Sequence, residues 1–201
     1  DWREVLAVGF STCTQQMCAS LALAQRIKAA HPAVQIVLGG ANCTGTMGIG
    51  LSQAFPFVDY VCLGEGEFAL PRLVQALAEE GPGAAVPGMM GRRTAAAASM
   101  GMPECVADLD SLPYPDYTDY VAQLAQHFGA RQPRWEVPFE TTRGCWWAVR
   151  QPCHFCSAVL PQNVLRSKTP ARVLAEIDHL TAHYGADMLV TDLAINPPYH
   201  K

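Results

Sequence analysis

The feature that most constrains the fold is an alternation of short apolar runs with helix-like segments over the first 81 residues. Three such runs lie at 4–13, 34–40 and 58–67, and the second and third stop at glycines. Continuous apolar runs of this length are typical of strands buried on both faces of a parallel sheet. Strands that alternate with helices favour the order βαβαβα. We therefore predict an α/β domain built on a parallel sheet.

A change in composition marks the end of this domain. Residues 82–113 are rich in proline and glycine, and "VPGMMGRR" (86–93) is long enough for one edge strand only. In "LDSLPYPDY" (109–117) each proline pushes the residue before it out of helical geometry, which indicates an extended connection. We place the first domain at 1–108 with its edge segment, a linker at 109–135 and a second unit at 136–201.

The second unit contains one strand, helix and strand in succession. "EVPFETTRGC" (136–145) and "ADMLVTDLAI" (186–195) are strand-like. Between them the pattern predicts a helix with Thr169 as N-cap and Gly185 beyond its end. Its apolar spacing predicts one buried face, made of Val173, Leu174, Ile177, Leu180 and Tyr184.

Three cysteines are grouped in "RGCWWAVRQPCHFC" (143–156), namely Cys145, Cys153 and Cys156, with gaps of seven and two residues. No segment has the features of a signal peptide, and in a reducing compartment grouped thiols indicate metal or redox chemistry rather than disulfides. Three thiolates suit a 4Fe-4S cluster in which one iron stays open for a small molecule carrying an amine and a carboxylate. Phe155 and the two tryptophans after Cys145 would exclude water from it.

A structural zinc site is the main alternative for these thiols. Such a site normally takes four protein ligands. The segment offers one Cys-x2-Cys pair, with His154 between its two thiols, and Cys105 is far away in the chain. Zinc held by the three thiols would make the protein a non-catalytic, metal-stabilised binding module.

Several motifs resemble a known group of enzymes. "PFETTRGCWW" (138–147), the Cys-x7-Cys-x2-Cys spacing and "LRSKTPARVLAEID" (165–178) resemble the radical S-adenosylmethionine (SAM) enzymes that mature ribosomally made, bacteriocin-type peptides. "VLGGANCTGTMG" (37–48) and "FPFVDYVCLGEGE" (55–67) resemble the cobalamin-binding domain that precedes the radical domain in this group. The resemblance implies a Rossmann-like cobalamin-binding domain followed by the first βαβ unit of a partial (β/α) barrel. We expect the chain to be a truncated fragment that is inactive alone.

The resemblance also implies cofactors, partners and contacts. It implies a 4Fe-4S cluster on the three cysteines, SAM on its open iron, cobalamin on the first domain, a precursor peptide as substrate and an external electron donor. Methyl transfer through cobalamin, cross-linking and rearrangement of the peptide all stay open as outcomes. The SAM contacts would be Arg143, Phe155 and Asp192. The cobalamin cradle would be Ser11, Thr12, Gly39, Gly40, Asn42, Gly64, Glu65 and Gly66, where glycines permit close approach.

The sequence departs from the family pattern at three places. "SAVLP" (157–161) stands where a "GLNG"-like stretch is expected, and "TDLAI" (191–195) stands where "TDN" is expected. No Asp-x-His-x-x-Gly pattern occurs in the first domain, so we expect no histidine ligand to cobalt. The altered segments leave open a degenerate homologue that keeps the fold without turnover. Arg166 and Lys168 are either acid-binding residues or solvated basic residues before a helix.

The composition excludes two classes of partner. The formal net charge is −4 and charged residues make up only 16% of the chain, which argues against a general nucleic-acid-binding surface. No apolar run approaches the roughly 20 residues that a membrane helix needs. We therefore expect a cytoplasmic protein that binds neither nucleic acid nor membrane.

Overall fold

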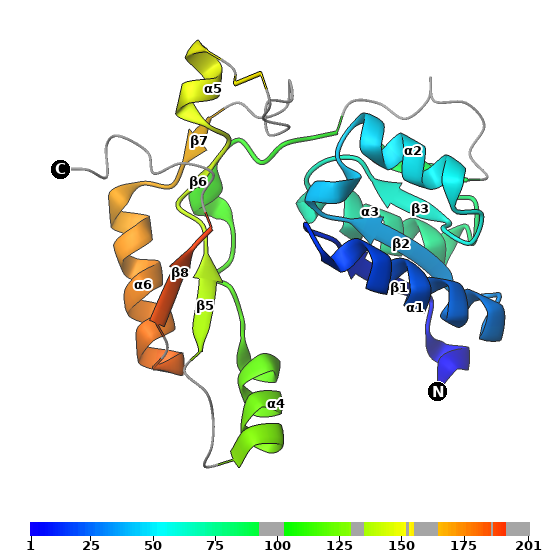
Figure 1. Cartoon of the computed structure of the whole chain (residues 1–201), viewed down its shortest axis with the longest axis horizontal. Coiled ribbons are helices and arrows are strands. Elements are labelled where there is room, and N and C mark those ends of the chain that lie inside the picture. The colour runs from blue at the N-terminus through cyan, green and yellow to red at the C-terminus, as the bar shows by residue number, and fades with distance from the viewer. Residues whose placement is uncertain (93–102, 130–134, 152, 155–164, 186, 192–201) are drawn as a thin grey trace. The chain divides into compact units, whose positions relative to one another are not determined.

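The computed structural model describes residues 1–92, 103–129, 135–151, 153–154, 165–185 and 187–191. The chain separates into two compact units, Asp1–Val106 and Ala107–Lys201. Each unit has its own sheet and its own apolar core (Figure 1).

The first unit carries a four-stranded sheet in the order β1-β2-β3-β4. Its strands are β1 (Ala7–Ser11), β2 (Gln35–Gly39), β3 (Tyr60–Cys62) and β4 (Met89–Gly91). Its helices are α1 (Gln16–Ala30), α2 (Thr46–Ala54) and α3 (Gly66–Glu79), with the short 3-10 turns η1 (Trp2–Glu4) and η2 (Ala41–Cys43). The first three strands run parallel and β4 runs antiparallel to β3. The predicted parallel sheet and its edge strand are confirmed.

The pleat of the central strands divides their apolar side chains between two cores. Ile36, Leu38 and Val61 lie in the core shared with α1 and α2. Val37 lies in the other core, against Leu73 of α3. Successive side chains of a strand point to opposite faces, so α1 and α2 cover one face of the sheet and α3 covers the other. Burial on both faces explains why β2 is apolar at consecutive positions.

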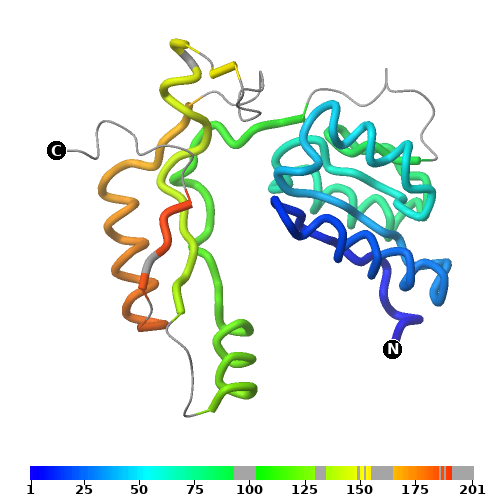
Figure 2. The backbone as a smooth tube through the Cα atoms, in the orientation of Figure 1, coloured from blue at the N-terminus to red at the C-terminus, as the bar shows by residue number. Residues whose placement is uncertain are grey.

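The second unit is built on a parallel pair of strands, β5 and β8, joined through helix α6. Its strands are β5 (Glu136–Phe139), β6 (Thr142–Arg143), β7 (Arg166–Ser167) and β8 (Asp187–Val190). Its helices are η4 (Leu109–Ser111), α4 (Thr118–Phe128), α5 (Trp146–Arg150) and α6 (Pro170–Tyr184). Figure 2 shows α6 running alongside the β5–β8 pair. The predicted succession of strand, helix and parallel strand is confirmed.

Local sequence signals fix both ends of α6. The Thr169 side chain accepts a hydrogen bond from the Arg172 amide at 3.2 Å, and Pro170 occupies the first turn, where its missing N–H costs nothing. Gly185 ends the helix in the left-handed conformation, with φ of 60°. The predicted cap residues therefore lie where the sequence indicates.

The stretch expected to be a linker, 109–135, differs from that expectation. Only its proline-rich part is extended, and α4 follows at Thr118. Tyr117 and Trp135 pack against the core of the second unit, where Val137 and Phe139 are buried. The hydroxyl of Tyr117 donates to the carbonyl of Pro138. A proline restricts the backbone of the residue before it, and Pro115 is the last proline before α4. Nothing in this effect prevents a helix from beginning at Thr118.

One residue of the predicted apolar face of α6 is on the outside. Leu174 is 63% exposed, whereas Val173 and Leu180 are buried. The buried face includes Glu176 instead, which is fully buried. Positions 173, 176 and 180 lie on one side of a helix, while position 174 is turned about 100° from 173.

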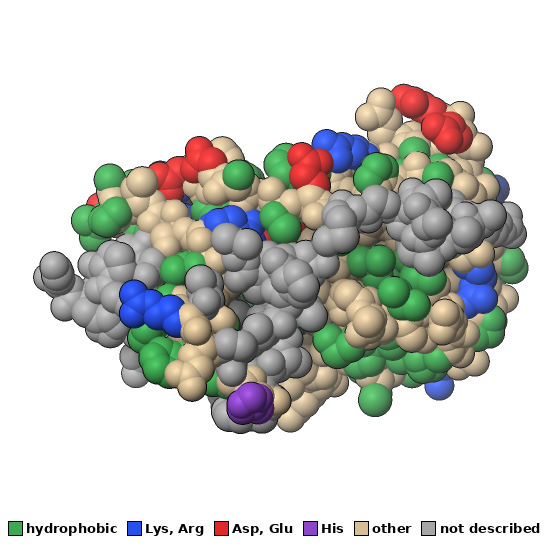
Figure 3. All heavy atoms as spheres, turned by 90° about the horizontal axis from the view of Figure 1, so that it is seen from above, with side chains coloured by type: hydrophobic (Ala, Val, Ile, Leu, Met, Phe, Trp, Pro, Cys, Tyr) green, Lys and Arg blue, Asp and Glu red, His purple; other side chains and the backbone are tan. Residues whose placement is uncertain are grey.

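Apolar side chains also occur on the surface. Figure 3 shows them, in green, among polar and backbone atoms on the upper face of the first unit. Among the helices that the structure describes, none is both long and apolar enough to span a bilayer.

Two leucines of α6 give a matched test of this packing. We expect Leu180→Ala to lower the free energy of unfolding of the second unit by about 2–5 kcal/mol, because it opens a cavity in the core. We expect Leu174→Ala to change it by less than about 0.5 kcal/mol. Urea denaturation followed by tryptophan fluorescence measures both, since three of the four tryptophans lie in this unit. Equal losses would contradict the orientation of α6.

Candidate functional site

In the first unit the candidate residues gather at the carboxyl edge of the parallel strands. Ser11 ends β1, Gly39 ends β2, and Gly64 follows the end of β3 by two residues. The three strands are adjacent and parallel, so these ends lie at one edge of the sheet. Ligands of open α/β sheets bind at such an edge. The structure therefore brings the predicted cradle residues together.

Thr12 joins the first two loops of this edge. Its amide and its hydroxyl both donate to the carbonyl of Gly39, at 2.7 and 2.9 Å. Its own carbonyl accepts from the Asn42 amide at 3.2 Å, and its hydroxyl lies 3.5 Å from the Cys43 sulfur. Thr12 is fully buried. Its side chain therefore shapes the cradle and does not face a ligand.

The glycines at this edge fall into two kinds. Gly40 has φ of 91°, and a Cβ there would lie 2.5 Å from the carbonyl oxygen of Thr12. A Cβ on Gly64 would lie 2.5 Å from the Cβ of Pro103. A Cβ on Gly66 would meet no described atom within 4 Å, and one on Gly39 would make only an ordinary contact at 3.7 Å. Packing of the chain itself accounts for Gly40 and Gly64, and it does not account for Gly66.

The side chains of Glu65 and Asn42 bind other parts of the unit. Glu65 accepts a hydrogen bond from the Val106 amide at 2.7 Å, and the Asn42 side chain donates to the Thr14 carbonyl at 3.3 Å. Burial raises the pKa of the Cys43 and Cys62 thiols, so both are neutral at physiological pH. The cradle thus offers backbone and open space rather than charged ligands.

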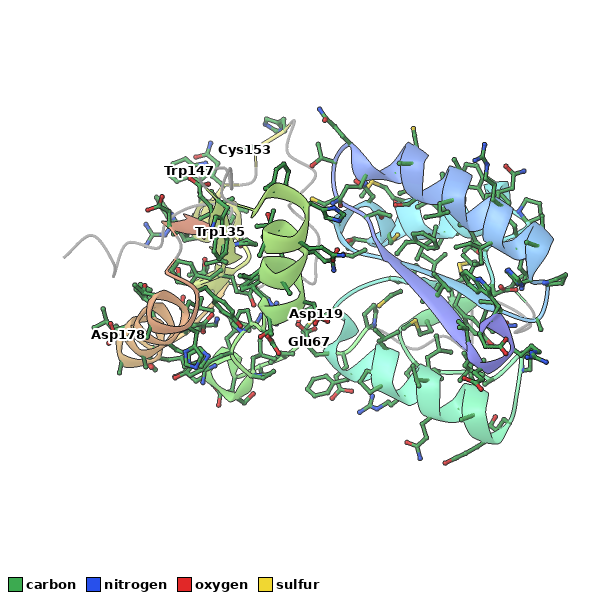
Figure 4. The ribbon with its side chains drawn as sticks, turned by 90° about the horizontal axis from the view of Figure 1, so that it is seen from below. Glu67, Asp119, Trp135, Trp147, Cys153 and Asp178 are labelled. Carbon is green, nitrogen blue, oxygen red and sulfur yellow. The ribbon has the colours of Figure 1, made fainter. Side chains whose placement is uncertain are left out.

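The second candidate site is the cysteine loop, which we define as residues 144–165. Cys145 stands at the N-cap of α5, and Cys145 and Cys153 are free thiols of intermediate exposure. Figure 4 shows Trp147 and Cys153 at one end of the second unit. Cys156, Phe155 and Asp192 lie outside the described residues. Within the described ones no three metal-binding side chains come together, so the structure tests neither the iron cluster nor the zinc site.

The thiols described fit a metal-binding role chemically, because Cys145 and Cys153 are neither oxidised to a disulfide nor fully buried. Arg143, the predicted SAM contact before them, binds Glu140 through Nε and Nη2, at 2.9 and 2.7 Å. Thr191, directly before Asp192, donates to the Phe139 carbonyl through its amide at 3.0 Å and its hydroxyl at 3.2 Å. Thr191 therefore ties the end of β8 to the end of β5.

Sequence reasoning missed a buried ionic group beside the loop. Lys168 is not solvated: its Nζ lies 2.9 and 2.7 Å from the two carboxylate oxygens of Glu176, and both side chains are buried. The Arg172 Nε is 3.5 Å from Glu176, and its guanidinium lies over the Tyr114 ring at 4.0 Å. The sequence does contain a signal for this pair: Glu176 falls on the apolar face of the predicted helix. A buried carboxylate needs a nearby cation.

The same junction carries a second anchor. Asp110 accepts hydrogen bonds from the Thr169 amide at 2.8 Å and the Thr169 hydroxyl at 2.7 Å. These bonds hold the pKa of Asp110 below its usual value, so the carboxylate is ionised at neutral pH. The start of α6 is thereby attached to η4.

No protein-family model matches the sequence. The chain is 27% identical over 172 residues to the cobalamin-dependent radical SAM methyltransferase TokK of Streptomyces tokunonensis, a match that covers 85% of this chain and 24% of TokK. It is 26% identical over 182 residues to an uncharacterised methyltransferase of Pyrococcus horikoshii, covering 89% of this chain and 37% of that protein. The chain thus spans about a quarter to two fifths of the length of these relatives.

Two solved proteins share the fold. The cobalamin-dependent SAM radical enzyme OxsB, with aqua-cobalamin and SAM bound, matches 96% of this chain and 26% of its own, with a TM-score of 0.65 and 18% identity. The radical SAM methyltransferase TsrM of Kitasatospora setae, with tryptophan and a SAM analogue bound, matches 94% of this chain and 36% of its own, with a TM-score of 0.57 and 19% identity. The relatives of known chemistry are radical SAM enzymes. The mixed α/β fold with its parallel sheet matches theirs.

Gly40 and Gly66 allow the two kinds of glycine to be compared. We expect Gly40→Ala to lower the free energy of unfolding by about 2 kcal/mol or more, because both its backbone conformation and its space exclude a Cβ. We expect Gly66→Ala to be neutral or to stabilise by up to about 1 kcal/mol. Urea denaturation followed by far-ultraviolet circular dichroism measures both. A Gly40→Ala protein as stable as the parent would contradict the geometry at Thr12.

Proposed function

We propose that this chain carries the cobalamin-binding domain and the beginning of the radical domain of a cobalamin-dependent radical SAM methyltransferase. The observation that carries the proposal is the match to TokK, which extends over 85% of the chain, so a match of that length reaches into both units. The fold shared with OxsB over 96% of the chain supports it.

In this proposal each unit of the chain has a separate task. Cys145, Cys153 and Cys156 would hold a 4Fe-4S cluster as its thiolate ligands, and SAM would bind beside it. When bound, the cluster supplies the electron for reductive cleavage of SAM, and cobalamin supplies methyl transfer. Arg143, Phe155 and Asp192 contact SAM, and an external donor reduces the cluster. The substrate is a ribosomally made precursor peptide, on the strength of the motif resemblance alone.

The cradle binds cobalamin through backbone groups in this proposal. At this edge Gly66 has open space at its Cβ position and Ser11 is exposed, whereas the side chain of Thr12 is used within the protein. Because no histidine stands in a cobalt-ligand pattern in the sequence of this unit, affinity comes from burial of the cofactor against the strand ends.

The cysteine loop is tested by anaerobic reconstitution of the full chain with iron and sulfide. We expect about four irons per chain and a visible absorbance that bleaches on reduction. Cys145→Ala, Cys153→Ala and Cys156→Ala should each lose most of it, because each removes one of three thiolate ligands. Cys18→Ala, an exposed thiol of α1, is the control and should keep it. Zinc in place of iron in the metal analysis would support the non-catalytic module and contradict the proposal.

The cradle is tested by titrating hydroxocobalamin into matched glycine variants. Gly66 and Gly50 both have open space at the Cβ position, but Gly66 begins α3 shortly after the end of β3, whereas Gly50 lies in the middle of α2. We expect Gly66→Leu to weaken cobalamin binding at least about tenfold, the cost of roughly 1.4 kcal/mol, by filling space that the cofactor needs. Gly50→Leu should bind like the parent. Equal binding by both variants would place the cofactor elsewhere.

A further inference from the structure

The cysteine loop begins and ends at a two-stranded ladder. β6 pairs antiparallel with β7, with Thr142 opposite Ser167 and Arg143 opposite Arg166. The Lys168 amide extends the ladder by donating to the Thr141 carbonyl at 2.9 Å. Cys145 comes two residues after β6, so the place of the first thiol depends on the register of this ladder. We call the ladder the neck of the loop.

The neck is too short to define its own register. It has only two residues on each strand, and isolated two-stranded ribbons are at best marginally stable in water. A tether directly after β7 compensates for this. Lys168 binds both carboxylate oxygens of Glu176 on α6, and the exposed fractions of the two side chains are only 3% and 0%.

The charge of this pair matters more than its bulk. An apolar pair of similar volume is often as stable as a buried ion pair, so the ion pair is not needed for stability alone. If β7 slipped by one residue along β6, Ser167 or Thr169 would move towards Glu176. The buried carboxylate would then lose its lysine. Glu176 would keep only its 3.5 Å contact with Arg172, and a buried charge that loses its closest partner is unfavourable, so the pair selects against neighbouring registers.

The carboxylate is itself held in place. Arg172 lies 3.5 Å from it through Nε and donates to the Leu112 carbonyl at 2.6 Å through Nη2. Thr169, between the tether and α6, is fixed by its two hydrogen bonds to Asp110. Glu176, the partner of Lys168, is therefore held by α6 and Arg172 and would not move with β7 if that strand shifted.

We propose that Lys168 and Glu176 are positioning residues that hold the neck of the cysteine loop in one register and so fix where Cys145 is presented. The inference rests on the proposed function, because the group that needs this placement is the iron–sulfur cluster. The two residues act on the cluster through the backbone of β6 and β7 and make no contact with it.

The test compares the full chain with the double variant Lys168→Met/Glu176→Leu, which keeps an apolar pair at the site. Hydrogen–deuterium exchange of the Lys168 amide and of the neck residues 142–143 and 166–167 reports the neck with or without a cluster. The rate at which an iron chelator removes the cluster absorbance reports how firmly the thiolates hold the cluster. Lys28→Met, which breaks the Lys28–Asp59 ion pair in the first unit, is the control. Should the apolar pair fail to fold, Glu176→Gln is measured in the same way.

We expect the apolar pair to have a melting temperature near that of the parent, to lose amide protection at the neck, and to release iron about tenfold faster or more. The control should match the parent in both readouts. Unchanged exchange at the neck, or unchanged iron loss in a folded variant, would overturn the inference. A parent that takes up no cluster would overturn the proposed function instead, while the exchange measurement alone would still decide whether the pair holds the neck.

Discussion

Parallel pairing of strands is the constraint on which the candidate sites depend. A parallel neighbour is reached only by a crossover connection, so consecutive strands end at the same edge of a sheet. In the first unit this rule brings the loops after Ser11, Gly39 and Cys62 together. In the second unit the chain passes from the end of β5 through β6 into the cysteine loop. The end of β8 is hydrogen-bonded to the end of β5, because the Thr191 amide donates to the Phe139 carbonyl. The same geometry thus brings candidate residues to a strand edge in both units.

The cradle shows how such an edge can be rigid and still open. Thr12 satisfies its polar groups against Gly39 and Asn42, and Gly40 accepts a conformation that other residues avoid. These contacts fix the loops before any ligand arrives. Gly66, in contrast, has open space at its Cβ position and packs against no described side chain there. A cofactor that binds mainly through shape benefits from this division, because preorganised loops lose little entropy when it binds.

The sequence predicts the framework of both units because periodicity and caps are local signals. The strands of the first sheet, the edge strand near Met89, and α6 with its caps at Thr169 and Gly185 all follow from them. The prolines up to Pro115 predict an extended connection, but their effect is local and α4 begins at Thr118. The sequence indicates only a solvated or acid-binding residue at Lys168, because its partner Glu176 is recognised only once α6 is placed on its core. Tertiary pairing, and not propensity, decides the environment of Lys168.

The two units define strand register by different physical means. β2 has four buried residues in succession, so a one-residue shift would exchange its two apolar faces and misplace side chains in both cores. β6 and β7 are two residues long and cannot carry such a pattern. A short strand can still be specified by a single interaction if the wrong partner is costly enough, and a buried carboxylate provides that cost. A charge inside the second unit is therefore consistent with a loop whose two end points, at Arg143 and Arg166, are held in one register.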